Sequence, residues 1–256
     1  AQRLILTPGT IEMEHPTPSP VQLPRRELSP MPSPAVTQPD PQPQDRDKWI
    51  VEASFPTTPE QAQKVQRAAA TALGVPVSME LDCGGGVKLP LMLIPSGRFL
   101  MGSPKNEEGR YDDEGPQHEV TISKPFYMGK FPVTQAQYKA VIGEEPSYHK
   151  GSTSPVENVS WHEGREFCAR LTEYTKQIID LPTEAQWEYA CRAGTSASCY
   201  GELDALGWHV RAYQGVQSLR SRYGELDAIA WYDGNSGRTT HQVGEKSANA
   251  WRLHDM

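Results

Sequence analysis

Proline is distributed unevenly along the 256 residues of this chain, and its distribution limits what can fold. Eleven of the 23 prolines precede Asp45, in a stretch that has no Trp, Tyr or Phe. Such a stretch cannot bury enough apolar surface to offset its ordering entropy, so residues 1–47 are predicted to be a disordered, polyproline-like linker. About 210 residues remain for one folded domain, 48–256, which is enough to bury a sizeable core.

The charge pattern argues against two classes of partner. The formal net charge is -7, and the basic residues form no continuous stripe. Nucleic acids and anionic membrane surfaces attract clustered Lys and Arg, so neither is expected as a partner. The longest apolar run, residues 89–95, is too short to cross a bilayer, and the N-terminus lacks a secretory signal pattern. We expect a soluble protein, more consistent with a bacterial cytoplasm than with secretion, and Ala1 indicates a fragment of a longer chain.

Apolar alternation and turn residues predict both strands and helices after residue 48. Strands are expected at 49–55, 75–81, 87–94, 120–122 and 126–131, and around Phe99 and Met101. A helix is expected between the N-cap Thr58, which precedes Pro59, and Gly74, the left-handed residue that would end it. Its thin apolar stripe consists of Ala62, Val65, Ala69 and Leu73.

Two further helices are marked by capping boxes, in which a Ser or Thr pairs with a Glu or Gln three residues later. Ser160 with Glu163 begins one helix, and Thr183 with Gln186 begins the other. The predicted buried faces are Phe167, Leu171 and Tyr174 on the first helix and Trp187, Ala190 and Cys191 on the second. If Trp187 packs against the first helix, replacing it with Ala should cost roughly 3–5 kcal/mol.

Several features resemble functional motifs but have simpler explanations. A strand pattern follows Gly84-Gly85-Gly86, so the triplet predicts a turn rather than a phosphate-binding loop. The acidic residues 105–118 could bind calcium, but they lack EF-hand spacing and a solvated loop is favoured. Glu184 and Glu188 lie one helical turn apart, yet first-turn carboxylates already favour the helix dipole. The seven histidines are scattered, and no cysteines have zinc-site spacing.

Five phrases stand in the order and approximate spacing of the sulfatase-modifying-factor family, which includes the formylglycine-generating enzyme. They are residues 92–104, 113–116, 131–134, 155–161 and 181–194. Residues 249–256 resemble the family's approach to a Gly-Asn-Val-Trp-Glu-Trp motif, and the chain ends before that motif. The chain therefore resembles this family over about residues 55–256.

The resemblance implies a fold and a reaction. The implied fold is α+β, irregular, related to C-type lectins and low in regular secondary structure. The implied reaction is the copper- and O2-dependent oxidation of a protein cysteine to formylglycine, which activates sulfatases. The family's two copper(I)-binding cysteines match positions beyond Met256. This chain is thus expected to lack the family's C-terminal third and to be inactive, with copper expected only in a complete catalytic member.

The resemblance also assigns roles to four residues. Asn235 and Ser236 are the nearest match to a family calcium site made by an asparagine side chain and the next backbone carbonyl, although turn chemistry explains them equally well. Cys168 and Cys191 match helix cysteines that form disulfides with C-terminal partners in secreted members. The alternative, which we favour, is that both are buried as small apolar side chains.

This chain departs from the family pattern at three places. Asp180 stands where Arg is usual, and Arg252 stands where Gly is usual, at a position that often needs positive φ. Residues 200–205 recur at 223–228 as Tyr-Gly-Glu-Leu-Asp-Ala, and two copies are too few for a solenoid. Because family members carry one such segment before a phrase like residues 230–237, we interpret residues 200–222 as a duplicated insert.

Two functions remain open from the sequence. One is a formylglycine-generating-enzyme-like domain that is catalytically silent in this chain. The other is a non-catalytic, lectin-like module on a bacterial signalling protein that binds a protein or peptide ligand. The Pro-rich segment favours the second, because such segments commonly separate domains.

Overall fold

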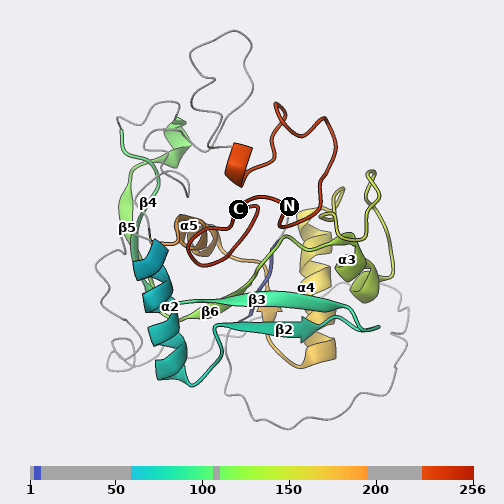
Figure 1. Ribbon diagram of the computed structural model, residues 1–256, viewed down its shortest axis with the longest axis horizontal. Helices are drawn as coiled ribbons and strands as arrows, with labels where there is room; N and C mark the ends of the chain where they lie inside the picture. The colour runs from blue at the N-terminus through green and yellow to red at the C-terminus, as the bar shows by residue number, and fades with distance from the viewer. Residues whose placement is uncertain (1–2, 7–58, 106–109, 195–226) are drawn as a thin grey trace.

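The computed structural model describes residues 3–6, 59–105, 110–194 and 227–256 (Figure 1). The strand predicted at 49–55, the N-cap Thr58, the insert 200–222 and most of the predicted linker lie outside these residues. Within them, the structure confirms the predicted irregular α+β class.

An antiparallel sheet forms the centre of the fold, with its strands in the order β2-β3-β6-β1-β7. These strands are β1 (Ile5–Leu6), β2 (Ser78–Asp82), β3 (Lys88–Ile94), β6 (Phe126–Gly129) and β7 (Ile179–Asp180). A separate antiparallel pair consists of β4 (Gly97–Met101) and β5 (His118–Ile122). The helices are α2 (Pro59–Leu73), α3 (Gln135–Ile142), α4 (Trp161–Thr175) and α5 (Glu184–Arg192), with a 3₁₀ turn at Asp112–Glu114.

The central strands are apolar on both faces, because each face of the sheet is covered. On β3, Leu91 and Leu93 belong to one core, which they share with Phe167 of α4. Met92 and Ile94 belong to a second core, on the opposite face. The run Lys-Leu-Pro-Leu-Met-Leu-Ile is therefore continuously hydrophobic after its first residue rather than alternating.

The two cores are closed by different elements. Helices α3 and α4 pack side by side over the first core, as Figure 1 shows. The second core is closed by α5, by the β4–β5 pair and by the C-terminal segment, through Tyr189, Phe99 and Trp251. Helix α2 contributes Ala69 to the first core and Ala62 to the second, so it covers the edge between them.

The predicted turns and capping boxes are confirmed. Gly84, Gly85 and Gly86 have φ angles of 92°, 60° and 80° and join β2 to β3, so the triplet forms a turn between strands. The Ser160 and Thr183 boxes begin α4 and α5. Thr134 forms a third box with Gln137 and begins α3, which the sequence analysis missed although the signal is the same.

Residues 3–6 are ordered in the sheet, although the sequence predicts them to be part of the disordered linker 1–47. Leu4, Ile5 and Leu6 are only 2%, 7% and 5% exposed, and β1 lies between β6 and β7. Sequence reasoning missed this strand because four residues beside a proline-rich stretch give no periodic pattern.

The predicted buried face of α5 is also wrong in one position. Trp187 is only partly buried and belongs to neither core, whereas Tyr189 is 5% exposed. The Tyr189 ring lies 5.3 Å from Phe99 and 5.0 Å from Trp251, between centroids. Helix α5 therefore packs against β4 and the C-terminal segment through Tyr189.

We expect the large loss of stability at Tyr189 instead of Trp187. Tyr189→Ala removes an aromatic ring from the second core and should cost about 3–5 kcal/mol of unfolding free energy. Trp187→Ala, on the same helix, is the control and should cost distinctly less. Urea denaturation followed by circular dichroism measures both, and equal losses would show that the packing of α5 is different.

Candidate functional site

The C-terminal segment, residues 227–256, contributes buried side chains to the fold. Trp251 and Leu253 are 1% and 0% exposed and belong to the second core. The Trp251 Nε1 atom donates a hydrogen bond to the Ala62 carbonyl oxygen of α2, at 3.3 Å. Gln66 of α2, which is also buried, donates to the Leu93 carbonyl oxygen at 2.8 Å. The segment is thereby joined to α2, and α2 to the sheet.

Asn249 fixes the course of this segment. Its Nδ2 donates to the carbonyl oxygens of Ala190 and Cys191, at 2.8 and 3.2 Å, near the C-terminal end of α5. Its Oδ1 accepts hydrogen bonds from the backbone N–H groups of Trp251 and Leu253, both at 3.0 Å. An asparagine amide has two donor hydrogens and two acceptor lone pairs, so this buried side chain is fully satisfied.

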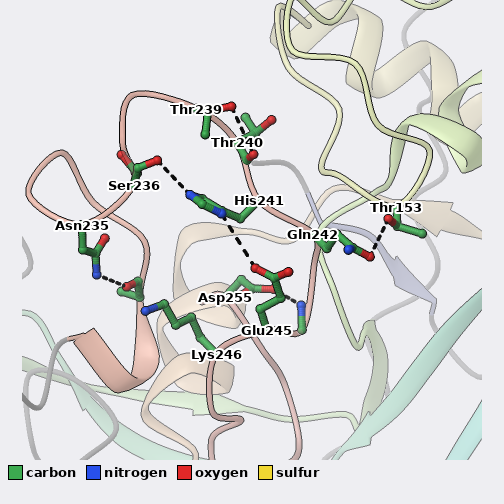
Figure 2. Close-up of polar contacts among 12 residues, drawn as sticks. Thr153, Asn235, Ser236, Thr239, Thr240, His241, Gln242, Glu245, Lys246 and Asp255 are labelled. Carbon is green, nitrogen blue, oxygen red and sulfur yellow. Dashed lines mark hydrogen bonds and ion pairs between the residues drawn. The ribbon is translucent and has the colours of Figure 1, made fainter.

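The turn at the proposed calcium residues is closed by protein hydrogen bonds. Asn235 Oδ1 accepts from the Tyr232 N–H at 2.9 Å, and its Nδ2 donates to Asp227 Oδ1, also at 2.9 Å. The Ser236 carbonyl oxygen lies 2.8 Å from His241 Nε2, which must carry the hydrogen because a carbonyl oxygen only accepts (Figure 2). These contacts agree with the turn explanation. Calcium binding at Asn235 and Ser236 stays a prediction.

An aromatic stack is joined to this turn through the hydrogen bond of His241 to Ser236. The Trp231 and His241 rings are parallel, with 3.6 Å between centroids and 9° between planes. The Lys246 ammonium nitrogen lies 3.8 Å from the centroid of the Trp231 ring, a cation–π geometry. Lys246 also donates to the Asp227 carbonyl oxygen, and Glu245 Oε2 lies 3.8 Å from His241 Nδ1. The stack holds residues 227–246 in one arrangement with little regular secondary structure.

Two loops are joined into one surface beside this stack. Thr153 donates from Oγ1 to Gln242 Oε1 at 2.9 Å and accepts at its carbonyl oxygen from the Val243 N–H at 3.1 Å (Figure 2). Thr239 Oγ1 lies 3.3 Å from His149 Nδ1. We define the joined-loop surface as Tyr148, His149, Thr153, Thr239 and Gln242. Tyr148 is 79% exposed, so this surface offers one open aromatic ring among hydroxyl, amide and imidazole groups.

The described cysteines are buried, and burial raises the thiol pKa of two of them. Cys83 and Cys168 are free thiols, 1% and 2% exposed, and burial raises the pKa of each thiol to about 12. A thiol with such a pKa is protonated at neutral pH, whereas the thiolate is the nucleophile and the metal ligand. Cys191 is 2% exposed, so Cys168 and Cys191 are both buried, as the favoured interpretation expects, while the disulfide alternative stays untested; Cys199 lies outside the described residues.

No metal cluster is present in the described part of the chain, where His, Cys, Asp and Glu do not gather in groups of three with suitable geometry. The acidic residues 105–118 are only partly described, and Asp112 and Asp113 are exposed. A solvated loop therefore agrees with what is described there. Within the same described ranges, no helix has the length and apolar character that would let it cross a membrane.

Three of the motif phrases meet at one buried polar junction. The Glu188 carboxylate accepts hydrogen bonds from the Gly102 N–H at 3.0 Å and from Arg192, which is 4% exposed. Gly102 has φ 86°, and a Cβ there would lie 2.4 Å from the Glu114 carbonyl oxygen. Ser103 Oγ donates to the Glu114 carboxylate at 2.6 Å. Glu188 thus has a structural role, and it does not form a catalytic pair with the exposed Glu184.

Residues 88–256, more than half of the chain, match the profile of the sulfatase-modifying factor enzyme 1-like domain. The chain belongs to this family. It is 28% identical over 204 residues to the chaperone protein LppX of Paenibacillus barcinonensis, covering 65% of this chain and 67% of that protein. It is 26% identical over 172 residues to the inactive C-alpha-formylglycine-generating enzyme 2 of Bos taurus, covering 47% of this chain and 54% of that protein. The chain thus spans about half the length of the bovine relative.

Further relatives support the same family and fold. The formylglycine-generating enzyme of Mycobacterium tuberculosis is 26% identical over 225 residues, covering 65% of this chain and 70% of that enzyme. The structure of PvdO from Pseudomonas aeruginosa superimposes with a TM-score of 0.53 at 23% identity, over 69% of this chain and 70% of that one. At this identity the structural likeness shows the fold alone.

The two substitutions that depart from the family pattern have different consequences. Asp180 replaces the usual Arg, and its carboxylate forms an ion pair with Arg165 of α4 at 3.1 Å, so the reversed charge has a partner. Arg252 replaces the usual Gly and has φ 63°, in the left-handed region. The expectation of a positive φ angle at this position is therefore confirmed. Arg252 adopts this left-handed conformation at an energetic cost.

We expect Arg252→Gly to stabilise the protein. Removing the Cβ relieves left-handed strain, while the added freedom of glycine in the unfolded chain offsets part of the gain, leaving about 0.5–1 kcal/mol. Arg252→Ala is the control, because it removes the charge but keeps the Cβ. Urea unfolding of both variants is the measurement, and equal stabilisation by Ala would assign the effect to the side chain instead of the backbone.

Proposed function

We propose that this chain is a non-catalytic member of the sulfatase-modifying-factor family and acts as a module that binds polypeptide segments. The observation that supports the non-catalytic part of this proposal is the burial of the free thiols Cys83 and Cys168. Copper(I) is held by thiolates, but burial keeps Cys83 and Cys168 protonated, with a pKa of about 12 each. Neither thiol therefore suits the family's reaction.

The relatives support a non-catalytic role. The bovine relative carries the word "inactive" in its name, and the Paenibacillus relative is named a chaperone protein. The family fold therefore serves proteins that do not perform the oxidation. A chaperone acts on other polypeptides, and the proposal transfers that class of ligand to this chain.

The joined-loop surface has the chemistry for such a ligand. Tyr148 offers a rigid ring with few rotatable bonds, and the hydroxyl and amide groups of Thr153 and Gln242 can pair with peptide N–H and C=O groups. The surface is pre-organised because two side chains fix the backbone at His149. Gln135 donates to the His149 carbonyl oxygen at 2.7 Å, and the His149 N–H donates to Glu157 at 2.7 Å. A pre-organised surface loses less entropy on binding.

The oxidation is the first measurement. Incubation of the chain with copper(I), oxygen and a Cys-x-Pro-x-Arg peptide should leave the peptide mass unchanged, because the cysteines that the structure describes are buried. The M. tuberculosis formylglycine-generating enzyme, treated identically, is the positive control. Conversion of the peptide cysteine by this chain would contradict the non-catalytic half of the proposal.

The second measurement concerns binding. A reduced, carboxymethylated α-lactalbumin, which cannot refold, is the probe, and fluorescence anisotropy measures its Kd. Tyr148→Ala combined with Gln242→Ala should weaken binding at least about tenfold, since exposed aromatic anchors dominate such interfaces. Lys124→Ala, at an exposed residue between β5 and β6, is the control and should leave the Kd unchanged. If the double variant binds as well as the unchanged protein, the joined-loop surface is not the binding site.

A further inference from the structure

We infer that the gap between β6 and β7 is a strand-acceptor slot, which binds an extended segment of one arginine followed by three apolar residues. In this chain the segment is Arg3-Leu4-Ile5-Leu6, which occupies the slot as a separable ligand. This site is distinct from the joined-loop surface and does not depend on it.

The segment is bound as a peptide is bound in strand addition. Ile5 pairs with Met128 on one side and Asp180 on the other, and Leu6 pairs with Tyr127 and Ile179. The Leu4 carbonyl oxygen accepts from the Gly129 N–H at 2.9 Å. Main-chain pairing of this kind supplies affinity without regard to sequence.

The side chains of the segment supply specificity. Leu4 and Leu6 enter the first core, and Ile5 enters the second, so alternate residues point to opposite faces of the sheet. Arg3, only 3% exposed, donates from Nη1 to the carbonyl oxygens of Gly129 and Lys130, at 2.7 and 3.2 Å. The slot therefore selects an arginine at the first position and apolar residues at the next three.

The two strands that form the walls of the slot, β6 and β7, are also held by other elements. β6 pairs with β3 at four consecutive positions, from Leu91 with Gly129 to Ile94 with Phe126. β7 is held by α4, because Thr172 Oγ1 accepts from the Ile179 N–H at 3.0 Å and donates to the Ile179 carbonyl oxygen at 3.2 Å. β6 thus has a strand partner other than β1, and β7, an edge strand that pairs with β1, is also held by α4.

The segment is remote from the rest of the domain along the chain. Residues 7–58 separate it from α2, and the family profile begins only at residue 88. At up to about 3.3–3.6 Å per residue, a connection of this length is long enough for the segment to leave the slot while it stays attached. Covalent attachment raises the effective concentration of the segment at the slot, so an identical segment from outside should replace it once the connection is cut.

Cutting the connection in the folded protein tests this. A protease site is inserted within residues 20–40 of the full chain, the folded protein is cleaved, and size-exclusion chromatography follows the N-terminal fragment. We expect the fragment to co-elute and a fluorescent peptide of residues 1–8 to replace it. The uncut chain should take up this peptide at least about 100-fold less well, because its own segment competes. Ile5→Asp in the peptide should abolish uptake, and Arg3→Ala should weaken it at least about tenfold.

Three results would overturn the inference. The first is release of the fragment on cleavage with an unchanged thermal midpoint, because the segment would then not occupy the slot. The second is a fragment that co-elutes but never exchanges with excess peptide, which would make β1 an integral strand. The third is uptake of the Ile5→Asp peptide equal to that of the unchanged peptide, which would show binding without the selectivity of the slot.

Discussion

Burial of the central sheet on both faces is the constraint on which the rest of the structure depends. β3, β6 and β1 each place apolar side chains on both sides, so the sheet requires two covering layers. Helices α3 and α4 provide one layer with regular structure. The other layer includes residues 249–253, which lie in no helix or strand. There the Asn249 side chain forms hydrogen bonds with backbone groups that a helix would otherwise pair with one another. A buried loop is stable only when its backbone groups find such partners.

The phrases that identify the family are explained by this architecture. Gly102 has no room for a side chain beside the Glu114 carbonyl oxygen, and Glu188 and Arg192 link α5 to the same turn. Residues 92–104, 113–116 and 181–194 thus belong together because they form one buried junction. Their presence shows that the chain has the family fold, and it is not by itself evidence for the oxidation.

The function that we propose for this chain depends on a binding surface and not on reactive groups. Cys83 and Cys168 are buried and protonated, and the carboxylate pair suggested by helical spacing consists of one structural and one exposed group. The polar and aromatic groups of the joined-loop surface lie on loops, which the core holds in place through Gln135, Asn235 and the stack of Trp231 on His241. Loops fixed on a rigid scaffold are the usual location of binding sites.

The sequence by itself determined the local structure and the family. Capping boxes at Ser160 and Thr183, the glycine turn at 84–86 and the apolar run of β3 depend on neighbouring residues, so their patterns are visible along the chain. Tertiary structure alone decided which faces meet. The inward side of α5 is Tyr189 and not Trp187 because the C-terminal segment supplies Trp251 as its partner, and Asn249 acquires its role only when α5 lies beside it. β1 was invisible in the sequence because its two residues pair with strands more than a hundred positions away, and no local pattern records a contact of that range.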